Sequence, residues 1–260
     1  MPLIRSCLLA CLALLTWPTA SAQMGAPPAK SEVAQLIEKA LASDIRTPEE
    51  RARDARERKP VQTLEFFGLQ PDMRVVELFP SAGWYTKILG PVLAERGKLY
   101  ISLGASRLAP RLKEIKLDKV EFLDDKTVFK PSSQRGTSMA DSINLPVRDV
   151  DMVLTFRNMH NLTPDTRTKL NKAVFDSLKP GGIYGIVDHT RRHNEPTSPE
   201  NWRRADPVQI IKEALDVGFV FEAYSDLHYR PDDLLLYDTQ RESIAGYSDR
   251  FTLKFRKPAR

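Results

Sequence analysis

The stretch Arg74-Val75-Val76-Glu77-Leu78-Phe79-Pro80-Ser81-Ala82-Gly83-Trp84-Tyr85-Thr86 decides how the rest of this 260-residue chain is interpreted. Apart from Arg74 and Glu77, its first six residues are apolar, which favours a buried strand over residues 74–79. Small residues and a glycine follow, and then a run that predicts a helix over residues 84–95. Strand, tight turn and helix in this order are typical of an open α/β sheet, in which ligands bind beyond the carboxyl ends of the strands.

Strands and helices alternate from this stretch to the end of the chain. Further strands are predicted over residues 98–103, 120–123, 151–156 and 183–188, and a final antiparallel pair over 219–225 and 251–256. This alternation predicts an α/β fold with a mainly parallel sheet, covered by helices on both faces, over residues 59–260.

The connecting segments carry the signals of helix starts and turns. Helices are predicted to begin at Thr163-Pro164-Asp165 and at Asp206, and the second of them to end at Gly218. Its inner face is expected to comprise Ile210, Ile211, Ala214 and Leu215. Pro180-Gly181-Gly182 is interpreted as a turn. Residues 126–144 have no clear pattern and are either a lid over the active site or an insertion.

Upstream of the sheet, residues 23–58 are interpreted as a linker and a helical extension. Ser31 is placed to cap a helix whose apolar residues recur at helical spacing, namely Val33, Leu36, Ile37, Ala40 and Leu41. Thr47-Pro48-Glu49-Glu50 has the pattern of a capping box and begins a second helix. Because residues 51–58 are mostly charged, we expect them to be exposed. A short apolar helix follows and ends at Gly68.

Residues 1–22 have the three parts of a secretory signal. Arg5 is followed by an apolar run over residues 6–17 and by Ala20-Ser21-Ala22, after which we expect cleavage. Two alternatives are a lipoprotein cut before Cys11 and a membrane-anchored helix. A cleaved signal predicts a periplasmic or secreted protein. Cys7 and Cys11 are the only cysteines, so the mature chain would use neither a disulfide nor a thiolate.

Composition and motifs narrow the class of protein further. The chain is 42% hydrophobic and 28% charged, with a formal net charge of +5, as in ordinary globular proteins. It has no basic run interleaved with aromatic residues, so we expect no nucleic-acid partner. No later apolar run approaches the length of a membrane span, so no stable membrane insertion is expected. Motifs of serine hydrolases, zinc proteases and P-loop proteins are absent, and Asp188, His189 and His193 lack a metal-ligand spacing. Nothing in the sequence indicates an oligomeric state.

Polar residues follow three of the predicted strands. Glu77 ends the first strand, Arg157, Asn158 and His160 follow the fourth, and Asp188 and His189 end the fifth. A carboxylate beside an imidazole can serve as a general base on an acceptor hydroxyl or amine, and it can equally be a structural ion pair. Glu77 is either a ligand contact or the cap of the next turn. The trio after the fourth strand either contacts a ligand or bonds its own loop.

Several of these segments together resemble a family of bacterial class I S-adenosylmethionine-dependent methyltransferases, which in many cases are exported. The resemblance covers residues 50–256 and rests on these matches: Arg51-Ala52-Arg53-Asp54 to Lys59-Pro60, Leu64-Glu65-Phe66-Phe67-Gly68, Gly83-Trp84-Tyr85-Thr86, Asp151 to Asn161, Leu178-Lys179-Pro180-Gly181-Gly182, Gly185 to His189, and Arg204-Ala205-Asp206. It implies a Rossmann-like, seven-stranded sheet that binds S-adenosylmethionine at the first turn.

The resemblance also implies site residues. The cofactor would contact Glu77, Pro80, Ser81, Ala82, Gly83, Tyr85, Thr86, Asp141 and Asn158, with Glu77 and Gly83 at its methionine end. The catalytic residues would be His160, Asp188 and His189, and no metal is expected. The substrate would be a small molecule or a component of the cell envelope.

The chain departs from the family at two places. Ser81-Ala82 occupies a part of the turn that is richer in glycine in the family. The second strand ends at Leu103-Gly104-Ala105-Ser106 without the usual acid for the ribose hydroxyls, leaving Ser102 or Ser106 as substitutes. Asp124 and Asp141 both fit the adenine contact. The sequence therefore supports two functions: a methyltransferase, or an inactive exported protein that kept the fold and binds a small molecule.

Overall fold

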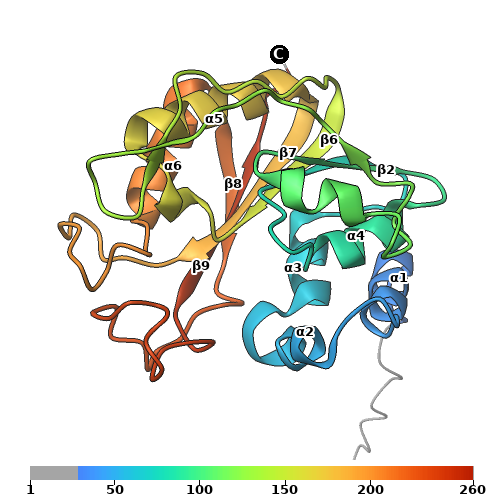
Figure 1. Cartoon of the computed structure of the whole chain (residues 1–260), viewed down its shortest axis with the longest axis horizontal. Coiled ribbons are helices and arrows are strands. Elements are labelled where there is room, and N and C mark those ends of the chain that lie inside the picture. The colour runs from blue at the N-terminus through green and yellow to red at the C-terminus, as the bar shows by residue number, and fades with distance from the viewer. Residues whose placement is uncertain (1–28, 260) are drawn as a thin grey trace, which may run out of the picture. The chain divides into compact units, whose positions relative to one another are not determined.

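A computed structural model describes residues 29–259, in which the chain from Ser31 onward forms one compact unit. Its main feature is a seven-stranded sheet with the strand order β3-β2-β1-β6-β7-β9-β8 (Figure 1). The strands are β3 (Glu121–Phe122), β2 (Lys98–Ser102), β1 (Arg74–Leu78), β6 (Val150–Phe156), β7 (Leu178–His189), β9 (Arg250–Arg256) and β8 (Val220–Ser225). The predicted fold class, with seven mainly parallel strands and helices on both faces, is confirmed.

The strand directions create a switch point beside β1. β1 pairs in parallel with β2 on one side and with β6 on the other. β3 continues the sheet in parallel beyond β2, and β7 beyond β6. Within this sheet only β9 runs antiparallel to its neighbours, β7 and β8. The predicted antiparallel pairing of the last two strands is confirmed. Because the chain crosses from one side of β1 to the other, a crevice is expected at the carboxyl ends of β1 and β6.

Helices cover both faces of the sheet. α1 (Glu32–Leu41), α3 (Pro60–Phe67) and α4 (Thr86–Leu93) pack on one face, and α5 (Pro164–Ser177) and α6 (Pro207–Val217) pack on the other (Figure 1). Val75 belongs to the first of these two cores and Val76 to the second. A strand buried on both faces must be apolar at successive positions, which explains the continuous apolar run of β1. None of the helices within residues 29–259 is both long and apolar enough to cross a membrane.

Local capping signals predicted the helix starts correctly. Ser31 accepts a hydrogen bond from the Ala34 N–H at 3.1 Å, and Thr47 and Glu50 form the predicted capping box of α2 (Pro48–Ala52). Thr163 caps α5, and Asp206 caps α6 by accepting from the N–H groups of its first turn. These caps form from residues within one turn of each other, so the sequence carries their whole signal.

Three local predictions are wrong. Residues 54–58 form a π-helical turn in which Glu57 and Arg58 are each only 5% exposed, because they pack against the sheet domain and its carboxyl edge. Leu215, expected on the inner face of α6, is 44% exposed. The predicted turn at residues 180–182 lies inside β7, whose pairing with β6 jumps from Val150–Leu178 to Met152–Ile183. The extra residues form a bulge, which sequence patterns describe as a turn.

The segment 126–144 contains a small hairpin. β4 (Lys130–Pro131) pairs with β5 (Ser138–Met139), and the Thr163 N–H donates to the Ser138 carbonyl at 3.1 Å. This bond ties the hairpin to the start of α5. Short 3-10 turns complete the described chain, at Ala105–Arg107, Ala109–Arg111 and Met159–Asn161. The predicted signal peptide, residues 1–22, and the first part of the predicted linker lie outside the described residues.

Candidate functional site

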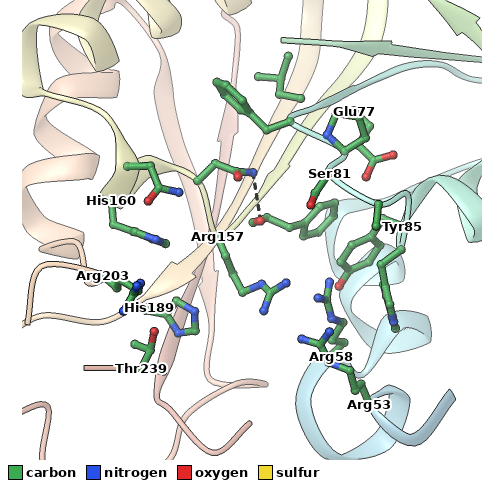
Figure 2. Close-up of a pocket in the computed structure, with 18 of the residues that line it drawn as sticks. Arg53, Arg58, Glu77, Ser81, Tyr85, Arg157, His160, His189, Arg203 and Thr239 are labelled. Carbon is green, nitrogen blue, oxygen red and sulfur yellow. Dashed lines mark hydrogen bonds between the residues drawn. The ribbon is translucent and has the colours of Figure 1, made fainter. Parts of the chain in front are cut away.

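A cavity of about 480 Å³ opens at the carboxyl ends of β1, β6 and β7, beside the switch point (Figure 2). Its wall combines Glu77, Leu78 and the turn 79–82 with Phe156, which ends β6, and with Arg157 and Asn158 after it. The helical extension contributes Arg53 and Arg58, and β7 contributes His189. A volume of this size is ordinary for a small-molecule site. Three strand ends and a helical segment far apart in the sequence therefore form one pocket.

Glu77 lies at the bottom of the wall formed by β1. Its side chain is 3% exposed, and Oε2 accepts a hydrogen bond from the Thr86 hydroxyl at 2.6 Å. Burial raises the pKa of Glu77 to about 7, although the Thr86 hydroxyl and the Arg58 charge act in the opposite direction. Thr86 is itself fully buried and does not line the cavity, so it positions the carboxyl group. A carboxyl group held in this way favours a cationic ligand group.

The turn after β1 is shaped by backbone conformation. Ser81 has φ of 55° and Gly83 has φ of 84°, both in the left-handed region. A Cβ at Gly83 would come within 3.1 Å of both methyl groups of Leu108. Gly83 does not line the cavity, whereas Pro80, Ser81 and Ala82 do. The glycine therefore shapes the turn, and its neighbours face the ligand space.

The neighbouring wall is formed by four residues: Tyr85 after β1, Phe156 at the end of β6, and Arg157 and Asn158 after it. The rings of Tyr85 and Phe156 stack with centroids 3.5 Å apart. Arg157 adopts φ of 66°, a left-handed conformation that costs free energy in a side-chain-bearing residue. The amide of Asn158 donates to the Thr155 hydroxyl at 3.2 Å and to the Phe156 carbonyl at 3.1 Å. Asn158 is thus held by its own strand end while it lines the cavity.

Asp188 orients His160 rather than the adjacent His189. The carboxylate of Asp188 is fully buried, lies 2.6 Å from Nδ1 of His160, and accepts from the backbone N–H of His160 at 3.0 Å. The ring of His189 instead contacts the Ser248 hydroxyl, at 2.8 Å. The carboxylate–imidazole pair suggested by the sequence therefore forms, but between residues that are 28 positions apart.

This pairing sets the chemistry of the two histidines. Because a carboxylate oxygen accepts, Nδ1 of His160 is the donor to Asp188, and no described residue bonds to Nε2 of His160. His160 lines the cavity, so Nε2 is available to a ligand. Burial, and secondly the Arg250 charge, lower the pKa of His189 well below its usual value. His189 therefore stays neutral and contributes polarity to the wall.

Arg58 is the functional candidate that the sequence did not reveal. Its guanidinium lies 4.3 Å above the Trp84 ring and 5.6 Å from the Tyr85 ring, and its Nε is buried with no hydrogen-bond partner. The Nε of Arg157 is also buried without a partner. Arg157 had been noticed as a polar residue after a strand. Arg58 gave no such signal, because it lies in a charged run that resembles a solvated helix.

A second cavity of about 420 Å³ lies on the other side of the β1 turn, at the end of β2. It shares Ser81 and Ala82 with the first cavity and is otherwise lined by Gly104, Arg107, Leu108 and Arg111. No acid lines it. Ser102, a suggested substitute for the ribose acid, donates to Asp125 at 3.0 Å and is fully buried. The two cavities together form a crevice that passes over the β1 turn.

The remaining predicted contacts lie elsewhere. Asp141 pairs with Lys130 at 2.7 Å and lines neither cavity of the crevice. Asp124 is exposed. The hairpin 126–144 contributes no residue to the large cavity, so it does not cover it. Among residues 29–259, no three histidine or acidic side chains gather as a metal site.

The crevice fits S-adenosylmethionine at one end better than at the other. Glu77 suits the ligand's ammonium group, and the guanidinium of Arg58 or Arg157 suits its carboxylate. Among the described residues no carboxylate pairs with Arg58 or Arg157, and both line the cavity, which is consistent with a ligand that supplies an acid. At the end of β2, the resembled family has an acid that binds the ribose hydroxyls. Here Arg107 and Arg111 line the cavity at that place.

Comparison with known proteins supports the fold. No family model matches the chain. A protein of Synechocystis sp., described as an uncharacterized methyltransferase, is 25% identical over 148 residues. The match spans 57% of this chain and 58% of that protein, little more than half the length of each.

Solved structures match over most of the chain. A SAM-dependent methyltransferase from Aquifex aeolicus is 17% identical, with a TM-score of 0.54, over 87% of this chain and 99% of its own. The [4+2]-cyclase SpnF is 16% identical, with a TM-score of 0.53, over 88% and 94%. The methyltransferase SibL is 13% identical, with a TM-score of 0.50, over 80% and 55%. Because one of these neighbours is described as a cyclase, the fold leaves the reaction open. The chain has, by sheet order and by these likenesses, the fold of the S-adenosylmethionine-dependent methyltransferases.

Proposed function

We propose that this protein is an S-adenosylmethionine-dependent methyltransferase that acts on a small molecule. The observation that carries the proposal is the Asp188–His160 pair, because His160 lines the same cavity as the buried Glu77 carboxyl group. In methyl transfer to a hydroxyl or amine, the carboxyl group would help to position the cofactor, and the oriented base would take the acceptor's proton.

Each residue has a distinct task in this reaction. S-adenosylmethionine, when bound, supplies an electrophilic methyl group. Glu77 would ionise on accepting the ligand's ammonium group, because a nearby positive charge lowers the pKa of a carboxyl group. Ser81 and Asn158 would contribute hydrogen bonds from the turn and from the end of β6. The stacked rings of Tyr85 and Phe156 would exclude water from one side.

His160 would accept the proton that the methyl acceptor loses. The acceptor's O–H or N–H donates to Nε2 of His160, and the proton stays there as the methyl group is attached. Asp188 stabilises the resulting imidazolium, since its carboxylate is fully buried and 2.6 Å from Nδ1. A positioned general base of this type contributes about 10²- to 10⁴-fold to the rate. We therefore expect His160→Gln to bind the cofactor normally and to lose that factor in turnover.

Calorimetric titration of the full chain with S-adenosylmethionine and S-adenosylhomocysteine tests the proposal. We expect binding that weakens about tenfold or more in Glu77→Gln, because the ammonium group loses its counter-charge. Glu121→Gln is the matched control, since Glu121 is an exposed glutamate at the far edge of the sheet. Absence of binding up to millimolar ligand contradicts the proposal.

A binding protein that kept the fold without the reaction is the second candidate. The end of β2 favours it, because Arg107 and Arg111 line that cavity and no acid does. The same titration separates the two functions. Normal folding without any binding of S-adenosylmethionine would favour the second, and screening with envelope metabolites would then follow.

We further propose that the protein is exported and acts in the periplasm or outside the cell. The support is the signal-like sequence of residues 1–22, which ends in Ala20-Ser21-Ala22. N-terminal sequencing of the protein from a periplasmic fraction is the test. The expected first residue is Gln23, and an intact Met1 in the cytoplasmic fraction contradicts the proposal.

A further inference from the structure

Two arginines on the cavity wall have no acidic partner. The buried Nε atoms of Arg58 and Arg157 lack any hydrogen bond, and no described carboxylate pairs with either guanidinium. The other arginines of this wall have acidic partners: Arg53 pairs with Glu57 at 3.0 Å, and Arg203 pairs with Asp238 at 2.5 Å. Figure 2 shows the Arg157 side chain pointing toward Arg58, with Arg53 beside Arg58.

The positive charges of Arg58 and Arg157 are both destabilised by burial. Burial, and secondly the charge of Arg157, lower the pKa of Arg58, and burial also lowers that of Arg157. Both groups remain charged near neutral pH, because a guanidinium gives up its proton very reluctantly. An uncompensated buried charge destabilises a fold, so its retention calls for a ligand that compensates it.

The nearby acids do not pair directly with either arginine. The charges of Glu57 and Asp188 raise the pKa of Arg157, but Glu57 pairs with Arg53 and Asp188 with His160. Glu50 is held by Lys87, with Nζ 2.8 Å from Oε1. Glu77 is bound by the Thr86 hydroxyl, and its raised pKa keeps it partly neutral at pH 7. The ligand space of this cavity is therefore positive before anything binds.

We propose that the cavity receives a methyl acceptor carrying an anionic group, a carboxylate or a phosphate, which Arg58 and Arg157 bind together. The inference rests on the proposed function and names its substrate class. S-adenosylmethionine carries one carboxylate, one ammonium and a sulfonium, so it brings a net positive charge into a pocket that is already positive. Even after its carboxylate pairs with one guanidinium, a second negative group is needed for neutrality.

The arrangement of the chain suits such an acceptor. Arg157 directly follows β6 and precedes His160 by three residues, and both side chains line the cavity. Arg58 comes from the helical extension, and its contacts with the Trp84 and Tyr85 rings hold its guanidinium in place. If Arg58 and Arg157 bind the anionic group of the acceptor, the rest of the acceptor lies in the cavity that His160 also lines. Guanidinium groups bind carboxylates and phosphates bidentately, which would also orient the acceptor.

The probe for this site is inorganic phosphate, titrated by calorimetry into the full chain with and without saturating S-adenosylmethionine. We expect phosphate to bind in both conditions and to bind about tenfold or more weakly in Arg58→Gln and in Arg157→Gln. Arg96→Gln is the matched control, because Arg96 is an exposed arginine that pairs with Glu32 far from the cavity. Circular dichroism and thermal unfolding check that each variant folds, and either arginine variant alone suffices for the test.

Four outcomes contradict the proposal in distinguishable ways. Absence of phosphate binding to the wild type removes the anion site. Equal weakening by Arg96→Gln shows nonspecific binding. Competition between phosphate and S-adenosylmethionine, with cofactor affinity falling in both arginine variants, assigns the pair to the cofactor's own carboxylate and leaves the proposed function intact. Phosphate binding without any cofactor binding removes the methyltransferase function itself, and the acceptor with it.

Discussion

Arg204 and Arg58 are both buried, and their surroundings are opposite. Arg204, 1% exposed, makes a two-pronged ion pair with Asp233 at 2.8 and 3.0 Å and donates to the carbonyls of Thr190 and Tyr237. Arg58, 5% exposed, has two aromatic rings beside it and no acid. The first arginine joins the loop after β8 to the end of β7. The second stands on the wall of the cavity.

This difference distinguishes a buried charge that stabilises the fold, Arg204, from a buried charge that we expect a ligand to compensate, Arg58. Asp233 also accepts from the N–H groups of Leu235 and Asp249, so every part of that ion pair is satisfied within the chain. A buried ion pair is tolerated when hydrogen bonds compensate its desolvation, and removing one partner exposes that cost. The Arg58–Arg157 pair has no such compensation. Stability measurements should therefore respond in opposite directions at the two places.

The largest effect is expected from Asp233→Asn. The substitution leaves the Arg204 charge buried without its counter-ion, so the free energy of unfolding should fall by about 3 to 5 kcal/mol. Denaturant unfolding followed by circular dichroism measures it. Asp216→Asn, which breaks an exposed pair with Lys212 on α6, should cost less than about 0.5 kcal/mol. Similar losses in both variants would mean that burial does not distinguish the two pairs.

Glu77 should make stability depend on pH. Its folded-state pKa of about 7 lies above the ordinary value of 4.5, so the folded state holds a proton that the unfolded state has lost. Its contribution to the free energy of unfolding is full below pH 4.5 and declines by roughly 3 kcal/mol as the pH rises to 7.

Denaturant unfolding of wild type and Glu77→Gln between pH 4.5 and 8 checks this contribution. The glutamine variant should gain stability relative to wild type as the pH rises through this range, because it carries no charge to bury. Glu121→Gln is again the exposed control. A difference between Glu77→Gln and wild type that stays constant with pH would show that the Glu77 pKa is not raised.

The smallest effect, and one of opposite sign to that of Asp233→Asn, is expected from Arg58→Met. Methionine keeps much of the side-chain volume and removes an uncompensated charge, so the free energy of unfolding should stay the same or rise by about 1 kcal/mol. The same unfolding experiment, in buffer without phosphate, measures it. A loss of about 3 kcal/mol or more would place Arg58 with Arg204 among the residues that hold the fold.

Much of the fold could be predicted from the sequence because its signals are local. The apolar run before the turn 80–83, the Thr47–Glu50 capping box and the Asp206 cap each depend on residues a few positions apart. The alternation of strands and helices then restricts the sheet to a parallel, doubly covered arrangement. The bulge at residues 179–182 escaped prediction, because a bulge and a turn use the same glycines.

The candidate site could be predicted only in outline. Glu77, Asn158 and His160 were expected from their places at strand ends, and Ser81 from the family resemblance. All four line the cavity. The sequence pointed to Asp188 and His189 as neighbours, yet adjacent residues of a strand face opposite sides of the sheet. The Asp188 carboxylate could therefore meet His160 across the sheet edge, which no spacing in the sequence reveals.

Local order thus followed from the chain itself, and the pairing of distant charges followed from packing. Hydrophobic periodicity and caps act over one turn or one strand, so they are written in consecutive residues. Whether Arg58 is exposed or buried depends on how the helical extension packs on an edge formed by β1 and β6, some twenty and one hundred residues further along. Only the assembled sheet edge brings two guanidinium groups, one carboxyl group and one oriented imidazole around the same space.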